Sequence, residues 1–168
     1  KPIVTVAAMM LVEQGRMKLN DPITNWLPEL KDLKVETPEG DVPLQRPIQV
    51  HDLMRHTAGF VYADSTKSER IRKMYIEGNI ESREVDITGD EMLKNLGKIP
   101  LAHQPGTYFE YSISVDVLGL LLERLTGKTL DVLLKEMLFD PLGMKDTAFW
   151  VPPEKVDRLA DALDSDPQ

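Results

Sequence analysis

The sequence has 168 residues, 42% of them hydrophobic and 29% charged, and its formal net charge at pH 7 is −8. This length and composition suit one globular domain with its own core, and the sequence has no apolar run of the ~20 residues that a membrane span needs. The negative charge argues against nucleic-acid partners, which reward clustered lysine and arginine. Cysteine is absent, which excludes disulfides, thiolate metal sites and cysteine nucleophiles.

A helix is expected at the start of the sequence. One apolar stripe with helical spacing is formed by Ile3, Val6, Ala7, Met10 and Leu11. Gly15 supplies a stop signal, and Pro2 is tolerated only in the first turn of such a helix, which places Lys1 in that turn. Because the sequence opens inside a helix rather than with Met or a signal peptide, we interpret it as a fragment cut at Lys1.

The next part of the sequence alternates between loops and short helices. Residues 31–47 are polar and rich in proline, which predicts a surface loop with a short strand or hairpin. A short helix is predicted from about Val50 to His56, closed by Gly59. The segment 68–79 has the composition of a helix, and a further helix is expected to begin near Thr88, with acidic residues in its first turn.

The helical signal is strongest after residue 114. A helical face is formed by Leu118, Leu121, Leu122 and Leu125. Gly127 ends this segment, Thr129 is expected to cap the next helix, and the run 139–141 ends that one. Five or six helices with little strand predict a mainly α fragment, or the helical part of a mixed fold.

Several common sites have no support in the sequence. The three histidines, His51, His56 and His103, form no HExxH pattern, so we predict no metal site and treat them as structural or surface residues. No GxSxG, Walker or GxGxxG pattern is present, so an α/β-hydrolase elbow and a nucleotide site are not indicated, and we predict no cofactor.

Lys1 and Tyr111 remain as candidates for chemistry. A lysine in the first turn of a helix is disfavoured by the helix dipole, and burial would further favour its neutral amine, which can act as a base. A tyrosine just before a helix is in the opposite position, because the dipole and a nearby ammonium both favour the phenolate. The alternatives are a solvated terminal lysine and a tyrosine that packs over the edge of the core.

Four blocks of the sequence together resemble the serine β-lactamase and penicillin-binding-protein superfamily. They are "MLVEQGRMKLNDPITNWLPEL", "IQVHDLMRHTAGF", "QPGTYFEYSISVDVLGLLLERLTGKTL" and "MLFDPLGMKDTAFWVP", in the family's order and over nearly the whole sequence. The His-Thr-x-Gly and Pro-Gly-x-x-Phe-x-Tyr-Ser blocks are specific when they occur together. The resemblance is strongest to the class C branch and to the esterases that share its fold.

The resemblance implies roles for particular residues. It makes Lys1 the lysine of the Ser-x-x-Lys motif, whose nucleophilic serine would stand three residues earlier, and Tyr111 the tyrosine of the Tyr-x-Asn motif. In this family the lysine and the tyrosine together take the proton of the serine, which attacks an acyl carbonyl. The third motif, Lys-Thr-Gly, belongs to a late strand, and the "GKT" at 127–129 is not that strand because it precedes a helix.

Ile113 departs from the family pattern, since it stands where β-lactamases and peptidases carry the asparagine of Tyr-x-Asn. Isoleucine cannot hydrogen-bond an amide of the substrate, which favours esters over amides. Ser112 or Ser114 would compensate, or else act as helix caps.

The whole sequence, residues 1–168, is thus predicted to be the helical portion of one α+β catalytic domain that begins just after the nucleophile and ends before the third motif. Phe60, Tyr62 and Tyr75 are expected to line the acyl pocket or, alternatively, to pack in the core. The leading hypothesis is a carboxylesterase that acts through an acyl-enzyme on a small-molecule ester or amide, with the isolated piece inactive. A β-lactamase, a D-amino-acid peptidase, an acyltransferase and a catalytically silent binding module are the alternatives.

Overall fold

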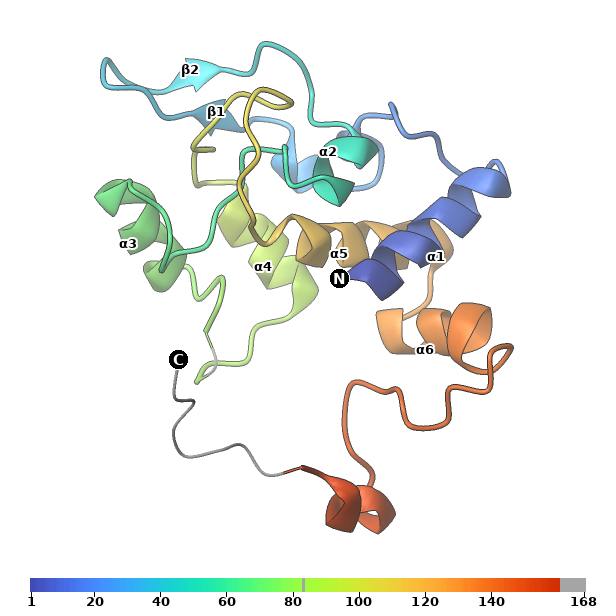
Figure 1. Cartoon of the computed structure of the whole chain (residues 1–168). Helices are drawn as coiled ribbons and strands as arrows, with labels where there is room; N and C mark the ends of the chain where they lie inside the picture. The colour runs from blue at the N-terminus through green and yellow to red at the C-terminus, as the bar shows by residue number, and fades with distance from the viewer. Residues whose placement is uncertain (83, 161–168) are drawn as a thin grey trace.

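The protein is mainly helical, as predicted. A computed structural model describes residues 1–82 and 84–160 (Figure 1). The α-helices are α1 (Pro2–Glu13), α2 (Val50–Met54), α3 (Glu69–Glu77), α4 (Gly89–Leu96), α5 (Ser114–Thr126) and α6 (Leu130–Leu134). The described part of the chain also holds short 3₁₀ turns at Ile23–Asn25, Pro28–Leu30 and Pro153–Arg158, and a π turn at Lys135–Phe139. Of the helices described, none combines the length and the apolar character that crossing a membrane requires.

Helix α5 is the centre of the fold. It packs against α1, α2 and α6, and Figure 1 shows these helices arranged around it. Its buried face includes Val117, Leu118, Leu121 and Leu122. The helix ends at Gly127, whose φ of +70° is the left-handed conformation that glycine adopts without steric cost. The strongest helical signal in the sequence therefore forms the helix against which α1, α2 and α6 pack.

Helix α1 begins and ends as predicted, but one residue of its expected apolar stripe faces solvent. Pro2 occupies the first turn, and Gly15 lies just beyond the end of the helix with a φ of +70°. Ala7, Ala8 and Leu11 are buried, whereas Val6 is 48% exposed. The stripe is narrower than expected because α1 packs along one side, against α5 and α6.

Two helix ends differ in detail from the prediction. Helix α2 ends at Met54, and the first residue with a positive φ after it is His56, at +55°, three positions before Gly59. Thr129 stands at the N-cap of α6 but makes no capping bond with its side chain. The carboxylate of Glu123 accepts the backbone N–H of Leu130 at 2.6 Å instead, because α5 and α6 pack against each other and bring this carboxylate to the free amides of α6.

The predicted hairpin is present within residues 31–47. Strand β1 (Lys34–Val35) pairs antiparallel with β2 (Val42–Pro43), with Lys34 opposite Pro43 and Val35 opposite Val42. Val35 also forms a parallel bridge with Leu101, so the hairpin is tied to the segment that leads to Tyr111.

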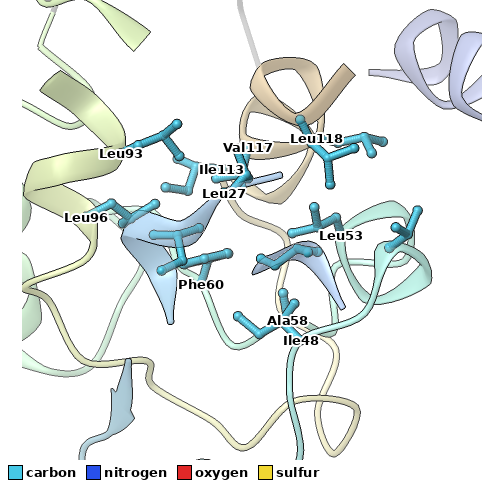
Figure 2. Close-up of a cluster of buried hydrophobic side chains, with 14 of the residues drawn as sticks. Leu27, Ile48, Leu53, Ala58, Phe60, Leu93, Leu96, Ile113, Val117 and Leu118 are labelled. Carbon is cyan, nitrogen blue, oxygen red and sulfur yellow. The ribbon is translucent and has the colours of Figure 1, made fainter. Parts of the chain in front are cut away.

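The hydrophobic core lies between α2, α4 and α5 (Figure 2). Phe60 belongs to this core and is only 2% exposed, and Ile113 lies in the same cluster between Leu93 and Val117. The core therefore fixes the position of the first turn of α5. It also fixes the residues just before the helix, because Ile113 is part of the core.

Candidate active site

The side chain of Lys1 is held by polar groups from distant parts of the chain. Its Nζ donates a hydrogen bond to the Tyr62 hydroxyl and another, of 2.6 Å, to the carbonyl oxygen of Ser112. A carboxylate oxygen of Asp116, in the first turn of α5, lies 3.6 Å from the same nitrogen. The Lys1 side chain is 25% exposed, so it lies at the base of a site and is not a freely solvated terminal lysine.

Tyr111 lies over the same lysine, three residues before α5. Lys1 Nζ is 4.5 Å from the centre of the Tyr111 ring. The centres of the Tyr62 and Tyr111 rings are 5.8 Å apart. Tyr111 is 55% exposed, and its hydroxyl hydrogen-bonds to no other described residue. The structure thus brings Lys1 and Tyr111 together, as the resemblance implied, and leaves the phenol open to a ligand.

His56 fixes the backbone on which Tyr111 stands. Its Nδ1 accepts the backbone N–H of Ser112 at 3.2 Å, and its carbonyl accepts the N–H of Glu110 at 3.0 Å. The imidazole also packs on the Tyr111 ring, 4.6 Å between centres. Burial, followed by the nearby charge of Lys1, lowers the pKa of His56. This keeps the imidazole neutral and its Nδ1 free to accept.

The two serines beside Tyr111 are completely buried. The Ser112 and Ser114 hydroxyls hydrogen-bond each other at 2.8 Å, and Ser112 Oγ also accepts the backbone N–H of Ser114 at 3.2 Å. Ser112 is not the N-cap of α5, which is Ile113, but its hydroxyl satisfies the first backbone N–H of the helix and its carbonyl accepts the bond from Lys1. Its hydroxyl does not line the cavity described next.

The glycines of the two specific sequence blocks both have a positive φ, which residues with a side chain rarely adopt, and Gly59 also lies too close to the backbone to accommodate a Cβ. Gly59 has a φ of +91°, and a Cβ there would lie 2.2 Å from the carbonyl oxygen of His103. Gly106 has a φ of +83°, and its Cβ would lie 2.1 Å from the guanidinium of Arg46. Because glycine allows these close approaches, the segment 101–111 packs against the residues that follow α2, and Tyr111 lies next to Lys1.

A cavity of about 910 Å³ opens beside this cluster. Its lining includes Tyr62, Tyr111 and Asp116, which all lie next to Lys1. The lining also includes Ile113, Tyr75, Ile80, Glu81 and Met92. Of the residues predicted for the pocket, Tyr62, Tyr75 and Ile113 contribute to its lining, whereas Phe60 lies in the core. The prediction for Phe60 is therefore wrong, because its side chain is only 2% exposed and packs in the hydrophobic core, which is the alternative considered for it.

Two acidic residues of this site, Asp116 and Glu81, were not predicted from the sequence. Asp116 stands five residues after Tyr111 in the first turn of α5, where a carboxylate would ordinarily be explained by the helix dipole. Glu81 lies in a stretch without periodicity, and burial raises the pKa of its carboxyl. One Glu81 oxygen accepts the N–H of Ala63 at 2.7 Å, while the other is buried without a partner among the described residues. Only the folded structure shows that Glu81 lines the cavity.

Groups of three or more histidines and carboxylates positioned to hold a metal ion do not occur within residues 1–82 and 84–160. The chemistry that this arrangement supports is proton transfer by an amine and a phenol at the edge of a cavity large enough for a small molecule.

A model of the Beta-lactamase family matches residues 1–168, which is the whole sequence. Esterase EstB of Burkholderia gladioli is 35% identical over 150 residues, covering 89% of this chain and 36% of that protein. Lovastatin esterase of Penicillium rubens is 33% identical over 178 residues, covering 99% of this chain and 42% of that protein.

Among solved structures, EstCE1, described as a hydrolase with promiscuous acyltransferase activity, superposes with a TM-score of 0.74 at 28% identity, covering 92% of this chain and 39% of that one. The present chain spans about two fifths of the length of each of these three proteins.

Proposed function

This chain belongs to the Beta-lactamase family, and from that membership we propose that the whole protein is a serine hydrolase that forms an acyl-enzyme and acts as a carboxylesterase. The observation that carries the proposal is the position of Lys1 Nζ, 4.5 Å from the Tyr111 ring at the edge of a 910 Å³ cavity. An amine and a phenol side by side can together accept the proton of a serine and pass it on.

In the proposed mechanism the nucleophile is a serine three residues before Lys1 in the whole protein. Lys1 and Tyr111 take its proton as the oxygen attacks the ester carbonyl, and they return the proton to the departing alcohol when the tetrahedral intermediate collapses. Water, activated by the same pair, then releases the acid. The reaction uses no metal or cofactor, and the 168-residue piece, without the serine, is proposed to be inactive by itself.

The preference for esters rests on Ile113. This side chain is 2% exposed and forms part of the cavity wall beside Tyr111. It offers the substrate an apolar surface and no hydrogen bond, so an amide or β-lactam would leave polar groups unpaired there, at a cost of about 1–3 kcal/mol. A small ester has no such group to satisfy. The names of EstB and lovastatin esterase agree with this choice.

The direct test is covalent labelling of the whole protein with a fluorophosphonate, followed by intact mass and peptide mapping. We expect one adduct on the serine three residues before Lys1, and a labelling rate that falls strongly in Tyr111→Phe. A folded whole protein that takes up no label would rule out the acyl-enzyme mechanism and leave the binding module as the alternative.

A second experiment separates the esterase from the lactamase. Turnover of a p-nitrophenyl ester and of a chromogenic cephalosporin is compared in wild type, Ile113→Asn and the apolar control Ile113→Leu. We expect Ile113→Asn to raise cephalosporin turnover relative to ester turnover, and Ile113→Leu to leave the ratio unchanged. An unchanged ratio in both variants would show that Ile113 does not decide between the substrates.

A further inference from the structure

Lys1 has more than one aromatic neighbour, and only one of them is hydrogen-bonded to it. The Nζ of Lys1 donates to the hydroxyl of Tyr62, whereas it lies over the ring of Tyr111 without a hydrogen bond to that phenol. We propose that Tyr62 is a positioning residue for Lys1, which, together with the carbonyl of Ser112, orients the amine for proton transfer. This inference rests on the proposed function.

The geometry of the amine supports this role. A lysine ammonium carries three N–H donors in a tetrahedral arrangement, and the neutral amine that acts as a base keeps two N–H groups and one lone pair. The two hydrogen bonds of Lys1, to Tyr62 Oη and to Ser112 O at 2.6 Å, match those two N–H groups. The lone pair must then point in the third direction. Two fixed acceptors therefore aim the base, which a single acceptor could not do.

Asp116 does not replace Tyr62 in this arrangement. Its carboxylate oxygen is 3.6 Å from Nζ, beyond ordinary hydrogen-bond distance, and its side chain is 55% exposed. A half-exposed charge at this distance contributes general electrostatic attraction but no direction. Ile113 has no polar atom to offer. Among the described residues, the acceptors that set the direction of the amine are Tyr62 and the Ser112 backbone.

The backbone around Tyr62 is fixed on both sides, as a positioning residue requires. The carbonyl of Tyr62 accepts the N–H of Thr66 at 3.0 Å, and the N–H of Ala63 is held by Glu81 at 2.7 Å. Arg72 of α3 donates to the carbonyls of Ala63 at 2.9 Å and of Thr66 at 2.7 Å. These bonds anchor the turn 62–66 to α3, so the Tyr62 hydroxyl is presented to Lys1 by a rigid support.

The test is Tyr62→Phe in the whole protein, which removes only the hydroxyl, with Tyr108→Phe as the matched control. Tyr108 is 56% exposed and stacks on His103, 4.4 Å between ring centres, away from Lys1. For a p-nitrophenyl ester we expect Tyr62→Phe to lower kcat about tenfold with KM within twofold of wild type, because a misaligned base slows proton transfer without changing substrate binding. Tyr108→Phe should match wild type.

Three outcomes would overturn the assignment. A raised KM with unchanged kcat would make Tyr62 a substrate-binding residue, and wild-type kinetics would give its hydroxyl no role. A loss as large as that of Tyr111→Phe, together with loss of fluorophosphonate labelling, would make Tyr62 itself the base.

A readout independent of turnover separates this inference from the proposed function. The ¹⁵N–¹H correlation of a lysine Nζ is seen when hydrogen bonds slow the exchange of its protons with water. We expect a Lys1 Nζ signal in the whole protein at low temperature that Tyr62→Phe abolishes and Tyr108→Phe retains. A signal that survives in Tyr62→Phe would refute the positioning role, whereas an inactive wild type that shows the expected pattern would refute only the esterase.

Discussion

Two polar clusters share the short segment that follows α2, and they differ in how completely their groups are paired. Thr57 belongs to the cluster around Asp52, and His56 belongs to the cluster around Lys1, Tyr62 and Tyr111. In the Asp52 cluster, a carboxylate that is 0% exposed accepts two bonds from Arg46 at 2.6 and 2.9 Å, the N–H of Gln49 at 2.9 Å and the Thr57 hydroxyl at 3.0 Å. In the Lys1 cluster, Tyr111 is half exposed and its hydroxyl has no partner among the described residues.

The difference indicates that the Asp52 cluster stabilises the fold, whereas the Lys1 cluster is available for binding and chemistry. Burial alone would raise the pKa of Asp52, but the bonds from Arg46 and Gln49 outweigh it and hold the pKa below its usual value, which is typical of a group that stabilises the folded state. Hydrogen-bonding capacity that the fold leaves unused, as at Tyr111, is available to a ligand. His56 and Thr57 are consecutive in the chain, and each serves one of the two clusters, so a single turn positions both.

The largest effect is expected at the Asp52 cluster and on stability. Asp52→Ala leaves Arg46 and Thr57 without their buried partner and should lower the free energy of unfolding by about 3 kcal/mol. Asp90→Ala is the matched control, because Asp90 also pairs with an arginine, Arg124, but has a side chain 80% exposed; it should cost less than about 0.5 kcal/mol. Urea unfolding of the whole protein measures both, and equal losses would contradict the distinction.

Tyr111→Phe should show the opposite pattern. We expect kcat/KM for an ester substrate to fall about 100-fold because a proton-transfer group is lost. The free energy of unfolding should stay within about 0.5 kcal/mol of wild type, since the hydroxyl is unpaired among the described residues. Steady-state kinetics and urea unfolding on the same preparation test the two halves. A variant that loses stability but keeps its activity would place Tyr111 with the structural group.

The contribution of His56 to the free energy of unfolding should depend on pH. Its pKa is lowered by burial and by Lys1, so the unfolded state binds the proton more readily than the folded state. The stability that neutral His56 contributes is therefore complete above about pH 6.5 and is lost as the pH falls through the lower folded pKa. His56→Phe should cost about 1–2 kcal/mol at pH 8, since the Ser112 N–H loses its acceptor.

The difference between wild type and His56→Phe should shrink as the pH is lowered from 7 to 5. Urea unfolding across this range measures the difference. A constant difference would show that His56 titrates in the folded protein as it does in the unfolded chain.

The smallest effect is expected at Glu81. Burial raises its pKa, so the stability linked to its protonated form is present below about pH 4.3 and is lost as the pH rises through the folded pKa. Glu81→Gln removes this loss and should stabilise the protein at pH 7 by less than about 1 kcal/mol. Glu84→Gln, at an exposed position of the same cavity wall, should have no effect. Thermal unfolding of the two variants compares them, and an equal response would exclude burial as the cause.

The sequence by itself predicted most of the helices and singled out Lys1 and Tyr111 as the candidates for chemistry. Helical spacing and stop signals act within a few positions of one another, so Gly15 and Gly127 marked the ends of α1 and α5, and Thr88 the start of α4, without help from the rest of the chain. The family blocks likewise singled out Lys1 and Tyr111, which the folded chain brings together.

The tertiary structure alone decided what surrounds that pair. Phe60 and Tyr62 were equivalent pocket candidates in the sequence. In the folded protein Phe60 packs in the core, whereas the Tyr62 hydroxyl accepts a hydrogen bond from Lys1. Ser112, Tyr62 and Lys1 are brought together across separations of 61 and 111 residues, and Glu81 reaches Ala63 across 18. Contacts of this kind depend on how α1, α3 and α5 pack, and local sequence patterns carry no information about packing between segments so far apart.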